Sequence, residues 1–461
     1  MKIVNKNEID PGSFRDPSGF IFVEDGEIYR QVNLVYKEHY DHLMHSGLYD
    51  KLTGARLMVS HEEMDQVPAR TDAAYKIIKP QRVSFLSYPY EWSFSQLKDA
   101  ALTTMEILKI ALQHDMILKD SSAFNIQFVN GKPIFIDTLS FERYREGEPW
   151  VAYRQFCQNF LAPLALMSCK DIRLNQLFRI YIDGIPLDLA SELLPFRSLL
   201  RFSLLTHIHL HSKSQKRYAE RPITRGTRKV GKFSLMGILD SLESAIRALQ
   251  WDPPRSQWSH YYENTNYSEE GLANKKRLVS EFLSEINPTK LWDLGANTGL
   301  FSRIAVEKEI ETIAFDSDPV AVELNYREQI SKGETRLLPL VLDLSNPSPG
   351  IGYENQERKA LLDRGPADCI MALALIHHLA ISNNVPFGKI AGFFGKLGNS
   401  LIVEFVPKSD SQVKRLLAAR DDIFTDYDQE NFENQFGRYF VTLRSENLKD
   451  SERVLYLMKK R

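Results

Sequence analysis

The sequence contains few cysteines, no long apolar run and almost no net charge. Of its 461 residues only Cys157, Cys169 and Cys369 are cysteines, and their spacing matches neither a metal site nor a disulfide framework. No apolar run reaches the length of a membrane-spanning helix, and the first ten residues hold no apolar signal core. The net charge of −2 argues against a general affinity for polyanions. We therefore expect a cytoplasmic protein with reduced thiols that binds neither nucleic acid nor membranes.

The length and composition of the chain indicate more than one globular domain. Its 461 residues, 43% hydrophobic and 26% charged, are typical of a chain with two or three domains. Pro253 and Pro254 follow a predicted amphipathic helix, and consecutive prolines end helices. We therefore place a domain boundary there. The predicted division is residues 1–195, a helical and basic linking region at 196–252, and residues 253–461.

A glycine-containing loop stands between two predicted strands in the last third of the chain. Residues 291–302, LWDLGANTGLFS, begin with an apolar run that is typical of a strand buried on both faces. Gly295 and Gly299 permit a tight turn and a close approach of the backbone to a ligand. Asn297 belongs to the few non-glycine residue types that tolerate a left-handed backbone. The next residues predict a helix whose N-terminal N–H groups face that ligand.

An acidic residue follows the second of these strands. Asp316, in IAFDSDP, lies about twenty residues after the loop, where a carboxylate can accept the two ribose hydroxyls of a nucleoside. The same arrangement serves NAD and S-adenosylmethionine (SAM), so the class of ligand depends on the motifs that follow. These are three further predicted strands with their loops and a final pair that we expect to be antiparallel, at residues 337–343, 367–379, 401–407, 437–447 and 453–460.

With these motifs, residues 251–461 resemble the class I SAM-dependent methyltransferases. The loop DLGANTG is similar to the D-x-G-A-N-x-G form of some O-methyltransferases. The resemblance implies an α/β, Rossmann-like domain whose seven-stranded sheet ends in an antiparallel hairpin; the alternative is an NAD or sugar-nucleotide protein. It implies SAM as the cofactor, with Asp293 at the methionine end, Asp316 at the ribose and Asp343 beside adenine. The full set of implied cofactor-binding residues is Asp293, Gly295, Asn297, Gly299, Asp316, Ser317, Asp343 and Leu344.

Three polar residues near the fourth and fifth of these strands are candidates for the chemistry. Methyl transfer needs a base only where an acceptor hydroxyl must lose its proton. His377 and His378 follow the fourth strand, at the edge where the acceptor is expected, and histidine titrates near neutral pH. Glu404 interrupts an apolar strand, and a buried carboxylate needs partners. We take His378, His377 and Glu404 as candidate catalytic residues; alternatively, the histidines shape the pocket and Glu404 belongs to an internal hydrogen-bond pair.

The first half of the chain predicts hairpins and an amphipathic helix. Residues 19–32 alternate apolar and polar side chains around an Asp-Gly pair, which predicts a β-hairpin. We expect a helix over 34–57, two strands within 76–89 and an amphipathic helix over 95–114. The Asn-Gly pair at 130–131 lies between two alternating runs and predicts a second tight hairpin.

Acidic and amide residues flank this second hairpin. Asp120 and Asn125 precede it and Asp137 ends it. This order resembles the catalytic segment of protein kinases and aminoglycoside phosphotransferases, which implies an α+β kinase-like domain. By that resemblance Asp120 would position an acceptor hydroxyl, and Asn125 and Asp137 would hold the magnesium ion of Mg-ATP. If this domain does not bind Mg-ATP, we expect no metal site in the chain. The chain departs from the family in lacking a glycine-rich phosphate loop, and an inactive scaffold is the alternative. The candidates for the nucleotide-binding cation are Arg30, Lys76 and Lys79.

Three further features precede the glycine loop. His207, His209 and His211 alternate without a nearby carboxylate or cysteine, so we expect packing or surface histidines rather than metal ligands. Residues 213–232 are basic and predict a solvated linker, or alternatively a contact with an anionic substrate. An aromatic cluster either covers the cofactor or packs between domains, and its members are Trp258, Tyr261, Tyr262 and Tyr267.

The sequence therefore predicts a SAM-dependent methyltransferase with an appended kinase-like domain. The whole chain is similar to bacterial proteins labelled NoeA-like nodulation proteins or PrmA-like methyltransferases. We expect O-methylation of a small-molecule or glycan hydroxyl by in-line methyl transfer. Two alternatives remain open: a bifunctional kinase–methyltransferase that uses Asp120, Asn125 and Asp137 with Mg-ATP, and a SAM-binding regulator without catalysis.

Overall fold

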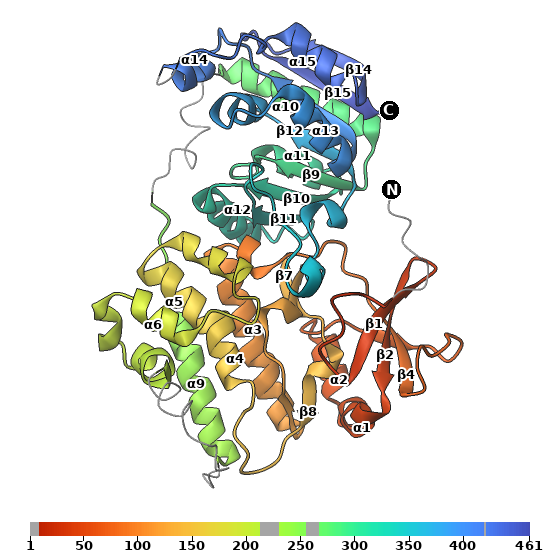
Figure 1. Cartoon of the computed structure of the whole chain (residues 1–461), viewed down its shortest axis with the longest axis vertical. Helices are drawn as coiled ribbons and strands as arrows, with labels where there is room; N and C mark the ends of the chain where they lie inside the picture. The colour runs from red at the N-terminus through yellow and green to blue at the C-terminus, as the bar shows by residue number, and fades with distance from the viewer. Residues whose placement is uncertain (1–8, 213–229, 255–266, 419–420) are drawn as a thin grey trace. The chain divides into compact units, whose positions relative to one another are not determined.

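The computed structural model describes residues 9–212, 230–254, 267–418 and 421–461. The chain divides into two compact units: unit 1 runs from red to green in Figure 1 and includes one short cyan-blue segment, and unit 2 runs from green to blue. Unit 1 comprises Met1–Asp252 and Ile351–Arg358, and unit 2 comprises Pro253–Gly350 and Lys359–Arg461. The division falls at the pair of prolines, but the predicted linking region 196–252 is not separate, because it belongs to unit 1. None of the described helices has both the length and the apolar character to cross a membrane.

Unit 2 is built on one seven-stranded sheet with the strand order β11-β10-β9-β12-β13-β15-β14. Neighbours from β11 to β13 are parallel, whereas β15 pairs antiparallel with both β13 and β14. The predicted sheet with its terminal antiparallel hairpin is thus confirmed. The strands are β9 Lys290–Leu294, β10 Glu311–Asp316, β11 Leu337–Val341, β12 Ala367–Ala372, β13 Gly398–Phe405, β14 Phe440–Asn447 and β15 Val454–Lys460.

Helices of unit 2 bury apolar stripes against this sheet. Val279 and Phe282 on α10 are fully buried in one core cluster with Met371 of β12 and Ile402 of β13. A side-chain cap fixes the start of α10, since the Ser268 Oγ accepts a hydrogen bond from the Gly271 N–H at 2.9 Å. The helices are α10 Glu269–Ile286, α11 Leu300–Val306, α12 Pro319–Lys332, α13 Phe387–Leu397, α14 Ser411–Leu417 and α15 Gln429–Phe436.

Unit 1 begins with a four-stranded antiparallel sheet of order β1-β2-β4-β3. Asp25 and Gly26 form its first turn with φ of 51° and 85°, so the predicted hairpin is confirmed. Two other predictions are wrong. Residues 81–89 contain no strand, so only one of the two strands expected within 76–89 is present. The helix expected over 34–57 is interrupted where Gly47 adopts a φ of 80°. The elements are β1 Gly19–Glu24, β2 Glu27–Asn33, α1 Lys37–His45, α2 Leu48–Gly54, β3 His61–Glu63 and β4 Ala74–Pro80.

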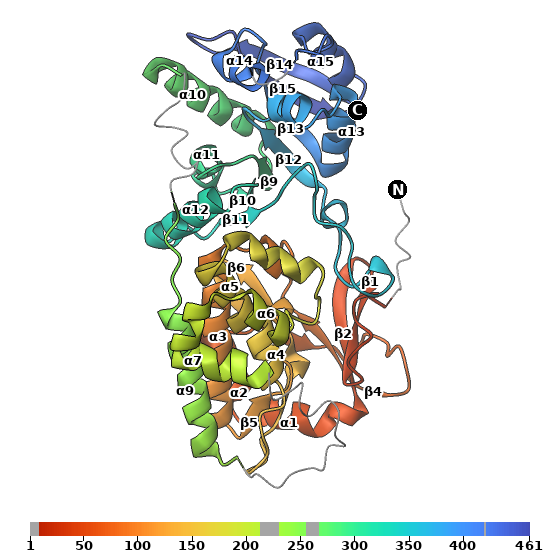
Figure 2. The same cartoon turned by 60° about the vertical axis from the view of Figure 1, so that its left-hand side comes forward.

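Two long antiparallel helices, α3 Phe94–Gln113 and α9 Lys232–Ala248, lie side by side in the rest of unit 1 (Figures 1 and 2). The Ser93 Oγ caps α3, so the predicted amphipathic helix is confirmed. The second predicted hairpin is also confirmed, with Asn130 at a φ of 51° in its turn. The other elements are β5 Met116–Leu118, β6 Ile126–Val129, β7 Lys132–Phe135, β8 Phe141–Arg143, α4 Tyr153–Phe156, α5 Ala162–Cys169, α6 Leu187–Leu193 and α7 Phe202–Leu204.

Candidate functional site

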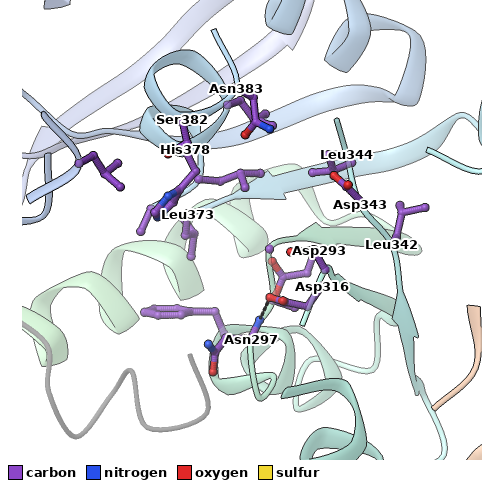
Figure 3. Close-up of a pocket in the computed structure, with 18 of the residues that line it drawn as sticks. Asp293, Asn297, Asp316, Leu342, Asp343, Leu344, Leu373, His378, Ser382 and Asn383 are labelled. Carbon is purple, nitrogen blue, oxygen red and sulfur yellow. Dashed lines mark hydrogen bonds between the residues drawn. The ribbon is translucent and has the colours of Figure 1, made fainter. Parts of the chain in front are cut away.

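A pocket of about 390 Å³ lies at the carboxyl ends of the parallel strands of unit 2 (Figure 3). Its wall includes Asp293 from β9, Asp316 from β10, Asp343 after β11 and Leu373 after β12. Loops that follow neighbouring parallel strands meet at one edge of the sheet, which is where open α/β sheets bind ligands. The volume is in the range of small-molecule sites, roughly 300–1,000 Å³.

The glycine loop adopts the backbone that its sequence predicts. Asn297 has a φ of 53° and Gly295 a φ of 78°. The N–H groups of Gly295 and Ala296 both donate to the Phe315 carbonyl, at 2.8 and 2.9 Å, which ties the loop to β10. A Cβ on Gly295 would lie 3.2 Å from the Leu375 Cδ1, so glycine keeps this part of the pocket open.

Asp316 is held by the loop it faces. Its carboxylate accepts hydrogen bonds from the N–H of Asn297 at 2.7 Å and of Asp318 at 2.8 Å (Figure 3). Burial raises the pKa of Asp316 to about 6, although these N–H groups oppose the rise. The Ser317 N–H forms a further hydrogen bond that lowers this pKa, and the carboxylate oxygens can still accept hydrogen bonds from hydroxyl groups of a ligand.

Asp293 is also buried, and the Ser302 Oγ donates a hydrogen bond to it at 2.6 Å. Burial raises the pKa of Asp293 to about 7. Near neutral pH a cationic or hydrogen-bond-donating ligand would therefore stabilise its ionised form. Ser317, Asp343 and Leu344 line the pocket as well. Of the predicted cofactor-binding residues, Gly299 alone does not line it.

Gly299 instead serves the helix that follows the loop. It is the N-cap residue of α11 and has a φ of 82°. A Cβ here would lie 2.6 Å from the side-chain amide of Asn325, so a larger residue would be both strained and crowded. We expect Gly299→Ala to destabilise unit 2 by about 1–3 kcal/mol. Denaturant unfolding beside Gly333→Ala, also at a positive φ but in open space, would separate crowding from backbone strain.

The two candidate histidines differ in their access to the pocket. His378 lines it, whereas His377 is 2% exposed and is not part of the wall. Their rings lie 4.2 Å apart, centroid to centroid. Burial lowers the pKa of His378 to about 4 and that of His377 further, so both imidazoles are neutral at physiological pH. His378 can accept a hydrogen bond from a ligand, but it is a weak base in this environment.

Glu404 does not line the pocket but supports residues that do. Its side chain is fully buried, and its Oε2 accepts hydrogen bonds from the Lys275 Nζ at 2.6 Å and the Ala374 N–H at 2.7 Å. Its Oε1 accepts from the Tyr267 hydroxyl and from Arg453. Burial alone would raise the pKa of Glu404, but the charges of Lys275 and Arg453 lower it to about 2. Glu404 therefore takes part in internal hydrogen bonds, the alternative to a catalytic role that the sequence analysis left open.

Some wall residues have no motif in the sequence. Lys275 is 2% exposed, and its Nζ lies 4.8 Å from the ring centroids of both Tyr267 and Phe301. Helical spacing gives one signal for it, because Lys275 stands one turn before Val279 on the buried face of α10. Tyr267 is the described member of the predicted aromatic cluster, and the other three members lie outside the described residues. Further wall residues outside the predicted motifs are Ser382, Asn383 and Leu416.

In unit 1 the three residues of the kinase-like pattern come together. Asn125 is hydrogen-bonded to Asp120, and burial and the charge of Asp137 raise the pKa of Asp120. Asp137 forms an ion pair with Arg30 of β2 and accepts a hydrogen bond from the Ser140 Oγ at 2.6 Å. Of the three candidate cations only Arg30 reaches this group, since the other two pair with glutamates. Among the described residues no cluster of His, Cys, Asp or Glu could hold a metal ion.

The alternating histidines have packing roles. The His207 Nδ1 is 2.6 Å from the Tyr153 hydroxyl, and its Nε2 is 2.9 Å from the Ser241 Oγ. His209 lies between Ser191 and Ser198 in the same way. Burial lowers the pKa of His207 to about 4, as expected for a neutral imidazole inside a core. The described residues thus match the packing interpretation of these histidines.

Comparison with known proteins gives one relative along almost the whole chain. No family model matches the sequence. The nodulation protein NoeA of Rhizobium meliloti (strain 1021) is 34% identical over 454 residues, which cover 96% of this chain and 94% of that protein.

Solved structures also match part of the chain. Magnesium protoporphyrin IX methyltransferase from Synechocystis PCC 6803 is 13% identical, with a TM-score of 0.32, over 44% of this chain and 93% of that one. The N-methyltransferase NodS from Bradyrhizobium japonicum WM9 is 10% identical, with a TM-score of 0.32, over 42% of this chain and 98% of that one. WbdD is 12% identical, with a TM-score of 0.31, over 43% of this chain and 42% of that one.

Proposed function

The chain belongs to the family of the nodulation protein NoeA, and from the pocket of unit 2 we propose that it is a SAM-dependent methyltransferase. The observation that carries this proposal is one acidic residue at or just beyond the carboxyl end of each of three neighbouring strands, all lining a single pocket: Asp293, Asp316 and Asp343. SAM offers a cationic amino group, two ribose hydroxyls and an adenine amine, and each of these groups pairs with a carboxylate.

The same acidic wall argues against a dinucleotide. A pyrophosphate needs N–H donors or cations, and Lys275 is the only Lys or Arg among the described residues of the wall. Its ammonium group is already bonded to Glu404. A second negative charge beside three carboxylates would be repelled, whereas the cationic sulfur of SAM would be attracted.

The acceptor side of the pocket supports methylation of a hydroxyl group. When bound, SAM would supply a methyl group whose carbon an acceptor nucleophile can attack, with the positively charged sulfur leaving as a neutral thioether. His378, Ser382 and Asn383 lie across the pocket from Asp293 and Asp316 (Figure 3). These side chains are uncharged at neutral pH and orient a hydroxyl by hydrogen bonds. His378 accepts a hydrogen bond from the acceptor hydroxyl and can take its proton as the methyl group is transferred, when the hydroxyl becomes strongly acidic. We propose a small-molecule or glycan hydroxyl as the acceptor.

Calorimetry on the full chain tests the cofactor assignment. We expect SAM and S-adenosylhomocysteine to bind and NAD not to bind. Asp316→Ala removes the acceptor for both ribose hydroxyls, so SAM affinity should fall at least about 100-fold, as expected for two lost charge-assisted hydrogen bonds. The matched control is Asp368→Ala, since this aspartate caps the start of β9, at the other edge of the sheet. NAD binding, or SAM binding unchanged in Asp316→Ala, would contradict the assignment.

The convergence of Asp120, Asn125 and Asp137 supports a second candidate function, a kinase-like phosphotransfer site in unit 1. Because Arg30 already neutralises Asp137, a magnesium ion would have to displace this guanidinium group. The bifunctional proposal therefore predicts that Mg-ATP binds to the full chain and that Asp137→Asn abolishes this binding without changing SAM affinity. Absence of Mg-ATP binding leaves the methyltransferase proposal alone, and SAM binding without turnover on any acceptor favours a regulator.

A further inference from the structure

An exposed apolar segment lies between α6 and α9 on unit 1. Phe196 is 81% exposed, Leu200 81% and Phe202 78%, within seven consecutive residues. The segment consists of the short helical turn Phe196–Leu200 and the start of α7, which Figure 2 shows at the outer edge of unit 1 beside α9. Single exposed apolar side chains are common, but three large ones together are typical of an interaction surface.

Two arginines alternate with these apolar side chains. Arg197 and Arg201 are both exposed. The guanidinium group of Arg197 lies 3.5 Å from the Cys169 carbonyl oxygen, and that of Arg201 lies 4.0 Å from the Cys169 Sγ. Neither forms an ion pair with a carboxylate in the part of the chain that the structure describes. Both line a cavity of about 210 Å³ together with Ser168, Cys169 and Ser198. The surface therefore combines apolar side chains with two cations that lack an acidic counterpart there.

The core beneath holds this segment in place. Ser198 is 1% exposed, and its Oγ lies 2.9 Å from the Nε2 of the buried His209. The other ring nitrogen of His209 lies 2.7 Å from the Ser191 Oγ on α6. Because Ser198 points inward, its neighbours in the turn are presented outward. The exposure of Phe196 and Leu200 thus follows from how the turn is anchored.

We propose that this apolar–arginine surface, Phe196 to Phe202, docks on membranes that contain anionic lipids. Phe196, Leu200 and Phe202 would enter the boundary between headgroups and acyl chains, and Arg197 and Arg201 would bind lipid phosphates. The sequence analysis expected no membrane binding, whereas in this proposal the chain binds membranes as a peripheral protein.

Charge favours lipid over a second copy of the chain. In a symmetric dimer the same patch appears on both subunits, so Arg197 and Arg201 of each would face like charges. An anionic bilayer instead offers phosphates to the arginines and hydrocarbon to the three apolar side chains. The surface thus matches both properties of the lipid interface.

Vesicle co-sedimentation of the full chain tests the proposal. We expect binding to phosphatidylcholine vesicles that contain phosphatidylglycerol, little binding to pure phosphatidylcholine, and weaker binding at high salt. Each arginine near such a surface contributes about fivefold, so Arg197→Ala/Arg201→Ala should weaken binding about 30-fold. Replacing the three apolar residues by serine should abolish it. Matched controls on unit 1 are Phe233→Ser, at a 93% exposed phenylalanine, and Arg173→Ala, at an arginine already paired with Asp171.

The outcomes separate this proposal from the methyltransferase proposal and from misfolding. SAM affinity and thermal unfolding should stay at the level of the unmodified chain in every surface variant, because the surface belongs to unit 1. The proposal is overturned if the chain does not bind anionic vesicles, if the arginine variant binds them equally well, or if pure phosphatidylcholine binds as strongly. It is also overturned if the chain is a dimer in solution that the serine variant dissociates, which would identify the surface as a subunit interface.

Discussion

Glu404→Ala is expected to lower the free energy of unfolding by about 3–5 kcal/mol and to weaken SAM binding with it. The substitution leaves Lys275 and Arg453, which are 2% and 1% exposed, without the carboxylate that balances them. Removing one partner of a buried ion pair is costly because the other group keeps its desolvation cost and loses the attraction that offset it. Asp410 still pairs with Arg453, so the Lys275 ammonium group accounts for most of the expected loss.

The effect on SAM binding follows from what else Glu404 holds. The Ala374 N–H donates to it, and Ala374 has a φ of 48°, a left-handed backbone that is costly for a residue with a Cβ. Ala374 and Tyr267 both belong to the pocket wall. Without the carboxylate, both residues lose the contact that fixes them. We therefore propose that Glu404 is a positioning residue, in place of the catalytic role considered from the sequence.

Three further variants separate charge from shape. Glu404→Gln keeps an oxygen for the Ala374 N–H, so it should lose stability but retain more SAM affinity than Glu404→Ala. Lys275→Met/Glu404→Leu removes both charges and should recover most of the stability without restoring SAM affinity. Glu281→Ala, which breaks exposed pairs with Arg277 on the same helix and with Arg444 of β14, should cost less than about 1 kcal/mol. Denaturant unfolding and calorimetry with SAM measure both effects, and equal losses in Glu404→Ala and Glu281→Ala would contradict the network.

Local chemistry made much of the fold predictable. The left-handed backbone of Asn297 and the Asp25-Gly26 turn were expected from residue types that accept this conformation. The sheet followed from the order of apolar runs. In each case the residues that determine the structure are within a few positions of one another, so the sequence pattern contains the cause.

Pairings across long separations were not predictable in this way. Glu404 and Lys275 are 129 residues apart, and Arg453 is 49 residues beyond Glu404. No local pattern marks three charged residues that become neighbours only when α10, β13 and the last hairpin come together. The position of Ile351–Arg358 in unit 1 has the same origin, since Glu357 pairs with Arg15 across 342 residues.

SAM affinity should fall about tenfold when the pH is lowered from about 7 to about 5. The ribose hydroxyls need an ionised Asp316, whose pKa burial raises to about 6 in the free protein. Below this value the carboxyl group is protonated, and its proton must leave before the ligand binds. Proton release near pH 6 is therefore expected, and calorimetry in two buffers of different ionisation enthalpy measures it directly.

The free protein should show the opposite dependence in its stability. A carboxyl whose folded-state pKa lies above its unfolded value stabilises the fold while it is protonated, and this contribution is lost as the pH rises through the folded pKa. For Asp316 and Asp293 these values are about 6 and about 7. Their contribution to stability should therefore decrease between about pH 4 and about pH 8, and SAM should raise the unfolding temperature most at the upper end of that range.

Two substitutions assign the titration to its residues. Asp316→Asn should bind SAM weakly and should lose the part of the pH dependence that occurs near pH 6, since no proton has to leave this position. Asp293→Asn keeps the partner of the Ser302 hydroxyl and should remove the part of the stability change that occurs near pH 7. If SAM affinity in the unmodified chain stays constant across this range, Asp316 does not carry the ribose contact. If Asp316→Asn keeps the full pH dependence, another group of the pocket releases the proton.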